Sequence, residues 1–217
     1  FISRIIEEIL GEAKISLVSI EGGDKHNAIP REAFANILIH PEHVSDAQNA
    51  VSNSARALRK EFGNVEKISV GFTGLGKSDS KCFTNEEQKQ LIGLLRTIPH
   101  GVLKYSHDVN GLVETSNNLA SIKIEGRKII IVCSTRSSIS EALDSQRKRI
   151  KIISEAFGAK TLQDNAYPGW TPDVNSPILK TTKKIYTKLL GKEPHISAIH
   201  AGLECGVIGE KVKGMDM

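Results

Sequence analysis

The stretch that decides the fold runs from residue 112 to residue 137 and reads LVETSNNLASIKIEGRKIIIVCSTRS. It contains two runs rich in apolar and β-branched residues, which are typical of strands. Between them lies the dipeptide Glu125-Gly126, a polar residue followed by the residue that turns most readily. The stretch therefore predicts two antiparallel strands joined by a tight turn.

Helical patterns flank this hairpin on both sides. Residues 84–99 begin with a capping box, in which Thr84 and Glu87 satisfy each other's backbone donors before an apolar periodic run. Residues 138–158 carry apolar residues at helical spacing and end at Gly158, which suits a helix C-terminus. Both segments are predicted to be helices that cover one face of the sheet.

The preceding third of the chain shows the same order of patterns. A helix, two strands, a helix and a strand are expected over residues 2–10, 13–23, 27–40, 41–62 and 66–72. The later third ends with another expected strand at residues 159–165. We therefore predict an α+β fold, a doubled ferredoxin-like α/β sandwich with an antiparallel sheet.

A change of architecture is expected at residues 167–177, YPGWTPDVNSP, which contain three prolines and the only Trp. Ser176 can cap a following helix with Pro177 in its first turn. Residues 195–212, HISAIHAGLECGVIGEKV, then indicate a strand that leads into a helix, as in a parallel α/β sheet. The predicted division is two lobes, about 1–76 and 77–168, followed by a parallel α/β fragment at 169–217.

Composition excludes several classes of protein. With 39% hydrophobic and 25% charged residues and no long apolar run, the chain resembles an ordinary globular protein without a membrane span. The net charge of +4 with 5% aromatic residues does not favour nucleic-acid binding. Three cysteines without a CxxC pair argue against a disulfide framework and favour a cytoplasmic protein. Because the chain opens inside a helical pattern without Met, we expect a piece of a longer protein.

One motif suggests a different function. Residues 71–78, GFTGLGKS, match the P-loop pattern, in which Lys77 would contact the outer phosphates and Ser78 a magnesium ion. Such a loop requires a helix that begins at Lys77, whereas the helical pattern begins only at Thr84. A glycine-rich connection is the favoured interpretation, and nucleotide binding is the alternative.

Polar residues mark the ends of several expected strands. They are Asn27, Asn117, Asn118 and Arg136. An arginine beside amides suits a clamp for a carboxylate, because its planar fork can bind both oxygens. A surface ion pair is the alternative for Arg136.

Four stretches together resemble the aminoacyl-histidine (Xaa-His) dipeptidase family of carnosinase-like zinc exopeptidases. They are NAIPREAFA (27–35), GLVETSNNLA (111–120), GAKTLQDNAYPGWTPDVNSP (158–177) and IHAGLECG (199–206). The resemblance implies a cytoplasmic hydrolase with two zinc ions, whose catalytic domain carries an inserted lid. Residues 1–168 would be the lid and 169–217 the start of the returning catalytic segment. The zinc ligands and the catalytic residues would lie outside this chain, so the segment alone is expected to be inactive and to bind no metal.

The resemblance also implies which residues bind the substrate. Arg136 would hold the free carboxylate of a dipeptide, with Asn118 nearby, Asn27 nearer the scissile bond and Glu204 at the active-site turn. For Glu204, the alternative is that its carboxylate caps its own helix. The implied partners are a dipeptide and the rest of the catalytic domain. Either a homodimer or a doubled lid that replaces a partner subunit is compatible with the sequence.

Overall fold

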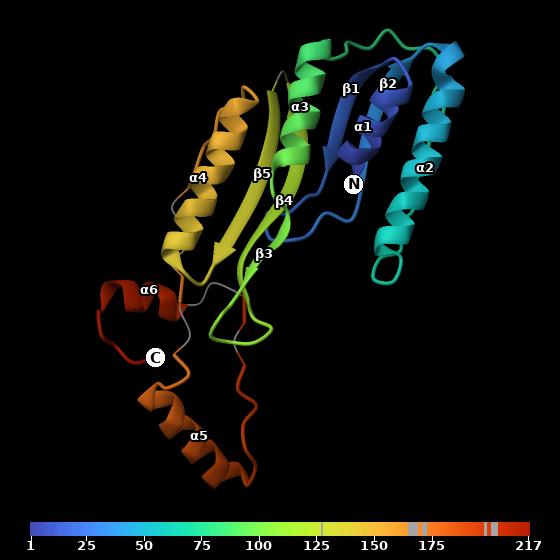
Figure 1. Ribbon diagram of the computed structural model, residues 1–217. Helices are drawn as coiled ribbons and strands as arrows, with labels where there is room; N and C mark the ends of the chain where they lie inside the picture. Colours follow the sequence, from blue (N-terminus) through green and yellow to red (C-terminus); the bar gives the residue numbers. More distant parts are fainter. Residues whose placement is uncertain (127, 165–168, 171–172, 198, 201–203) are drawn as a thin grey trace. The chain divides into compact units, whose positions relative to one another are not determined.

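The computed structural model describes residues 1–217 except 127, 165–168, 171–172, 198 and 201–203 (Figure 1). Its elements are α1 (Ile2–Glu12), β1 (Ile15–Gly22), β2 (Ala33–Ile39), the 3-10 helix η1 (Pro41–His43), α2 (Val44–Phe62), α3 (Asn85–Thr97), β3 (Gly101–Tyr105), β4 (Val113–Glu125), β5 (Lys128–Ser137), α4 (Ser140–Ala156), α5 (Pro177–Leu190) and α6 (Glu204–Lys211).

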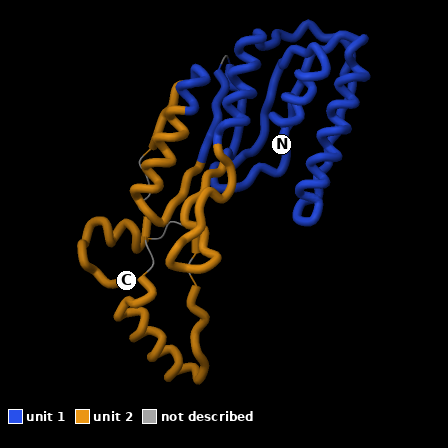
Figure 2. The backbone as a smooth tube through the Cα atoms, in the orientation of Figure 1, with its two compact units in different colours: residues 1–98, 119–133, 153–159 blue, residues 99–118, 134–152, 160–217 orange. Residues whose placement is uncertain are grey.

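The chain forms two compact units (Figure 2). Unit 1 contains residues 1–98, 119–133 and 153–159, and unit 2 contains residues 99–118, 134–152 and 160–217. β4, β5 and α4 contribute residues to both units. The predicted division into lobes at about residue 76 and a fragment after residue 168 stays a prediction.

The strands belong to one five-stranded sheet with the order β2-β1-β4-β3, in which β5 also pairs with β4. The pairs β1–β2, β1–β4 and β3–β4 are antiparallel. At the end of β4, Gly126 has a φ of 61°, a left-handed conformation that glycine adopts without strain. The predicted α+β class, the antiparallel sheet and the hairpin at residues 112–137 are confirmed.

The core of unit 1 explains why the first helical patterns fold as they do. α1 and α2 lie side by side against the β1–β2 pair (Figure 1), and their apolar positions recur on one helix face. Each fully buried aliphatic side chain stabilises the fold by about 1.5–3 kcal/mol. The largest fully buried apolar side chains of this core are Ile6, Leu17, Ile20 and Leu58.

A buried glutamine fastens α3 to β1. Leu17 lies opposite Ile37 in the β1–β2 pair, just before the register shifts between Leu17 and Ser19. The Gln88 side chain of α3 accepts a hydrogen bond from the Leu17 amide at 2.6 Å, and the Phe83 amide donates to the Leu17 carbonyl at 2.8 Å. The predicted capping box at Thr84 and Glu87 is confirmed and starts α3 beside these contacts.

We expect Gln88→Leu to lower the free energy of unfolding by about 1–3 kcal/mol, because the buried Leu17 amide loses its acceptor while the volume is nearly conserved. The matched control is Gln90→Leu on the same helix, where the glutamine is exposed. That control is expected to change stability by about 0.5 kcal/mol or less. Urea titrations followed by circular dichroism measure both values. Equal effects of the two substitutions would contradict a structural role of Gln88.

Three predicted strands are wrong within the described residues. Residues 66–72 have no strand partner, although Ile68, Val70 and Phe72 still pack on the core in alternation. Arg59 of α2 donates to the Ile68 carbonyl at 3.1 Å. The apolar alternation therefore correctly predicted which side chains are covered. The backbone, however, pairs with the Arg59 side chain and not with a neighbouring strand.

The other two expected strands, at 159–165 and 195–201, are irregular where they are described, that is, at residues 159–164, 195–197 and 199–200. At residues 163–164, side-chain hydrogen bonds with α4 take the place of a strand partner. Arg147 of α4 donates to the Asp164 carbonyl at 2.5 Å, and Gln163 donates to the Arg147 carbonyl at 3.1 Å.

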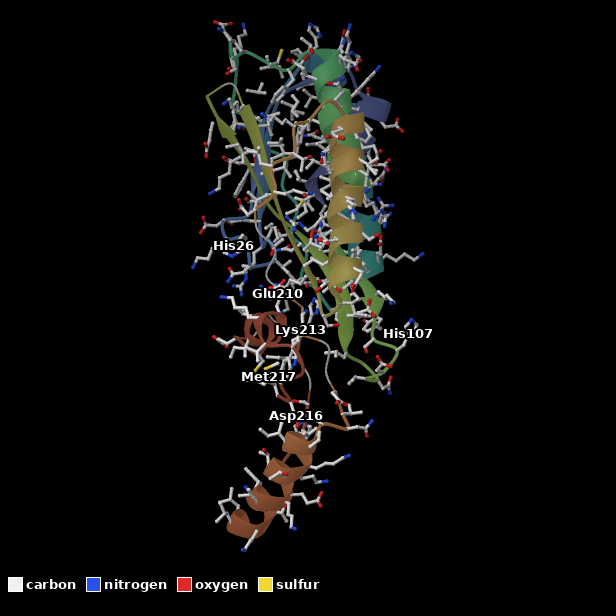
Figure 3. The ribbon with its side chains drawn as sticks, turned by 90° about the vertical axis from the view of Figure 1, so that its left-hand side faces the viewer. His26, His107, Glu210, Lys213, Asp216 and Met217 are labelled. Carbon is white, nitrogen blue, oxygen red and sulfur yellow. The ribbon has the colours of Figure 1, made fainter. Side chains whose placement is uncertain are left out.

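α5 begins as the sequence predicts, and a distant carboxylate adds to its cap. Ser176 accepts a hydrogen bond from the Leu179 amide, and Pro177 occupies the first turn. The Asp216 carboxylate accepts from the Ile178 amide at 2.6 Å and from the Ser176 hydroxyl at 2.5 Å (Figure 3). A carboxylate is favoured there because the first amides of a helix lack partners.

Candidate functional site

The β4–β5 hairpin of unit 2 is held in register by buried polar side chains. Asn117 is 1% exposed. Its amide nitrogen donates to the Pro99 carbonyl at 2.7 Å, and its carbonyl oxygen accepts from the Thr135 hydroxyl at 2.8 Å. The hydroxyls of Thr115 and Ser137 form a second cross-strand bond of 2.9 Å. Both bonds fit one antiparallel register, in which residues 115 and 117 of β4 lie opposite residues 137 and 135 of β5.

This register places Ser116 directly opposite Arg136. Residue 116 lies between the bonded residues of β4, and residue 136 lies between those of β5. Because side chains alternate along a strand, Ser116 and Arg136 project from the face opposite to the buried Asn117. Opposed Cβ atoms in such a pair are about 4.5–5.5 Å apart. Arg136 is exposed, and within the described residues no carboxylate forms an ion pair with its guanidinium.

His200 joins this face of unit 2 from a distant part of the sequence. Its Nε2 lies 2.7 Å from the Ser116 hydroxyl, a contact between residues 84 positions apart. Burial lowers the pKa of His200 from its ordinary value, and the positive charge of Arg136 lowers the pKa further. A backbone hydrogen bond at Val113 opposes these effects. The imidazole is therefore neutral at neutral pH.

The lowered pKa links His200 to the stability of the fold. Below an ordinary histidine pKa of about 6.5, the unfolded chain takes up a proton that the folded chain does not yet bind. The stability that the neutral His200 contributes is therefore present above about pH 6.5 and is lost as the pH falls through the lowered pKa.

The other predicted site residues lie in different settings. Asn118 is half-buried and lies two residues along β4 from Ser116, so strand alternation puts it on the face of Arg136. Asn27 is exposed in the turn between β1 and β2 of unit 1. Glu204 is exposed in unit 2 as the first residue of α6, the position that its helix-capping interpretation requires. The structure thus brings Arg136 and Asn118 onto one face of the hairpin, together with Ser116 and His200.

The sequence did not reveal Ser116 or His200. His200 belongs to IHAGLECG, one of the stretches that carry the resemblance, but its contact with Ser116 spans most of the later chain. Ser116 belongs to GLVETSNNLA, another of these stretches, but nothing else in the sequence indicates a role for it. Knowledge of the hairpin register would have identified Ser116, because residues 116 and 136 are equally far from the turn.

The P-loop alternative at residues 71–78 has no structural support. The described residues around Lys77 are exposed and irregular, and the next helix begins at Asn85. Ser78 instead forms a local hydrogen bond of 2.7 Å with Ser80. Without a helix N-terminus at Lys77, the loop lacks the aligned amides that hold phosphates.

The described residues do not fit the zinc pair that the resemblance implies. Among them, no three His, Cys, Asp or Glu side chains gather as a metal site requires. His40 and His43 both lie near Glu42, at 3.3 and 3.6 Å, but two histidines and one carboxylate at the surface do not form such a cluster. We therefore derive no catalytic step through a metal in this chain. Over the same described ranges, each helix is too short or too polar to cross a bilayer.

Comparisons with known proteins agree with this fold. A family model described as the peptidase dimerisation domain, of the M20 class, matches residues 1–66. Over 206 residues the chain is 34% identical to the cytosol non-specific dipeptidase of Escherichia coli (strain K12). The aligned region covers 95% of this chain and 42% of the relative. The crystal structure of aminoacylhistidine dipeptidase from Vibrio alginolyticus matches with a TM-score of 0.87 and 33% identity over 96% of this chain and 43% of that chain.

The chain is thus similar to peptidases as a class and, among them, to dipeptidases. Its N-terminal part is similar to the dimerisation domain of peptidases. The resemblance of nearly the whole chain to aminoacyl-histidine dipeptidases is confirmed by both sequence and structure. The chain spans less than half the length of both relatives, 42% and 43%.

The register of the hairpin can be tested through Asn117. We expect Asn117→Ala to lower the free energy of unfolding by about 2–4 kcal/mol, since each buried polar group left without a partner costs about 1–3 kcal/mol. The control is Asn36→Ala on β2, where the exposed side-chain amide of Asn36 donates to the Ser19 hydroxyl. This substitution should lower the free energy of unfolding by about 0.5 kcal/mol or less. Calorimetric unfolding measures both. A small effect at Asn117 would show that other contacts hold the strands.

Proposed function

We propose that this chain is the lid and an adjoining segment of a dipeptidase, and that Arg136 binds the free carboxylate of the substrate. The observation that carries the proposal is the exposed Arg136 guanidinium, which has no carboxylate partner within the described residues and shares a face with Ser116 and Asn118. The 34% identity to a cytosol non-specific dipeptidase supports the choice of a peptide as ligand.

A carboxylate clamp has a clear purpose in a dipeptidase. In every linear peptide the free carboxylate lies one residue from the last peptide bond, so a clamp on the carboxylate selects that bond, and in a dipeptide it is the only peptide bond. The guanidinium fork can bind both carboxylate oxygens, which fixes the direction of the peptide as well as its end. Asn118, on the same face, would donate its amide to the same carboxylate, while Asn27 and Glu204 are assigned to the rest of the substrate on the resemblance alone.

We infer the remaining features of the longer protein from the resemblance. We infer a cytoplasmic metallopeptidase that uses zinc, acts on Xaa-His and other dipeptides, and pairs this chain with the rest of its own catalytic domain. The match of residues 1–66 to a peptidase dimerisation domain supports a homodimer. In this proposal the described residues bind and orient the substrate, and the residues that cleave it lie elsewhere in the longer protein.

The isolated chain is expected to hydrolyse no Xaa-His dipeptide when zinc, cobalt or manganese is supplied. Its residues are assigned to substrate binding, and the described part gathers no metal-binding cluster. Release of free histidine, measured by chromatography, provides the assay, with the Escherichia coli cytosol non-specific dipeptidase as the positive control. Turnover that is proportional to the concentration of the chain would contradict the assignment.

In the longer enzyme, Arg136→Ala should lower kcat/KM for a dipeptide by about 30- to several-thousand-fold, because loss of one partner of a desolvated charge pair costs about 2–5 kcal/mol. Arg136→Lys should recover only part, since a point charge lacks the bidentate fork. Arg149→Ala, at another exposed arginine of unit 2, should leave kcat/KM unchanged.

The dipeptide amide separates a carboxylate contact from a structural role of Arg136. The wild-type enzyme should cleave the amide poorly, and Arg136→Ala should reduce that low rate little further. If Arg136→Ala reduces the rates for the acid and the amide equally, the guanidinium does not bind the carboxylate.

A further inference from the structure

The contact between His200 and Ser116 adds a basic side chain to the face of unit 2 that carries Arg136. The His200 imidazole lies 2.7 Å from the Ser116 hydroxyl, and Ser116 is the residue directly opposite Arg136. A histidine is thus held beside an arginine that has no counter-ion within the described residues. Two basic side chains on one exposed face are unfavourable together unless one is neutral or an anion joins them.

We propose that His200 is a specificity-determining residue of the carboxylate site, such that a carboxylate bound at Arg136 and a proton on His200 stabilise each other. The inference rests on the proposed function, because it takes the same carboxylate as its ligand. It adds a second, proton-dependent contact to the clamp and predicts that the site selects anionic peptide ends most strongly in mildly acidic solution.

The Ser116 hydroxyl can serve both protonation states of His200. When the imidazole is neutral, its Nε2 can accept the hydroxyl proton, and when the ring is protonated, Nε2 donates to the same oxygen. The bond to Ser116 therefore does not have to break when His200 takes up a proton. A neighbouring hydroxyl of this kind keeps the ring in place while its charge changes.

After burial, the charge of Arg136 is the next cause of the lowered pKa of His200. Arg136 faces the ring from β5, while β4 contributes the uncharged Ser116 and the backbone of Val113. Glu114, next to Val113, is buried and paired with Lys104 at 2.9 Å. Within the described residues no carboxylate forms an ion pair with His200. The ligand carboxylate would therefore be the first negative charge close to the imidazole.

The direction of the His200 pKa agrees with this coupling. Burial and the Arg136 charge hold the pKa of His200 below its ordinary value. A carboxylate on the guanidinium would cancel the second of these effects, so the pKa would rise. By reciprocity, whatever factor the ligand adds to the proton affinity of His200, the proton adds to the affinity for the ligand.

The test is a titration of the full chain with alanyl-alanine, whose side chains do not ionise, and with its C-terminal amide. NMR follows the pKa of His200, whose signal is assigned by its disappearance in His200→Gln, and calorimetry measures the dissociation constant at pH 5.5 and 7.5. Saturating dipeptide should raise the pKa of His200, and the amide should not. Binding should be about fivefold tighter at pH 5.5, the low end of typical coupling factors.

Variants assign the coupling to these residues. In Arg136→Gln, the pKa of His200 should already be raised without ligand, and the dipeptide should no longer bind. His200→Gln should still bind the dipeptide, with equal affinity at both pH values, whereas His195→Gln, at an exposed histidine of the same unit, should keep the pH dependence. Ser116→Ala should weaken the coupling without abolishing binding.

The outcomes separate this inference from the function on which it rests. If the dipeptide binds the chain and requires Arg136, but His200 keeps its pKa and His200→Gln keeps the pH dependence, the role of His200 is wrong and the clamp stands. If the dipeptide does not bind, or binds equally well to Arg136→Gln, the clamp and the role of His200 are both overturned. Folding of each variant is checked by its circular dichroism spectrum.

Discussion

The candidate site depends on the buried amide of Asn117. This side chain satisfies the Pro99 carbonyl before β3 and the Thr135 hydroxyl on β5, so it fixes the register of the hairpin from inside. A slip by one residue would move every side chain of a strand to its other face. Arg136 would then turn inward without a partner for its charge. The exposed position of Arg136 is therefore a consequence of a buried hydrogen bond.

The same register also fixes where the site residues lie on the hairpin. Ser116, Arg136 and Asn118 are carried by paired strands rather than by a loop, so their backbone positions are set by the sheet. His200 lies outside the helices and strands and is attached to the hairpin through Ser116. Substrate specificity in this account comes from one strand-borne cation and one histidine whose charge depends on it.

Much of the fold could be predicted because its signals are local. The hairpin turn at Gly126, the capping box at Thr84 and the Ser176 cap each depend on neighbouring residues, and each is confirmed. The predictions of strands at 66–72 and 195–201 were wrong, because the pairing of strands depends on residues far apart in the sequence, which apolar alternation does not record. For the same reason Arg136 could be nominated from its type and place, whereas the contact of His200 with Ser116 could not.

The most direct test of the central claim is a crystal structure of the chain with alanyl-alanine bound. We predict that the free carboxylate lies within hydrogen-bond distance of the Arg136 guanidinium, on the face of the hairpin that carries Ser116. His200 should still contact the Ser116 hydroxyl. A dipeptide whose carboxylate is held elsewhere, while Arg136 pairs with an acidic side chain of the protein, would contradict this prediction.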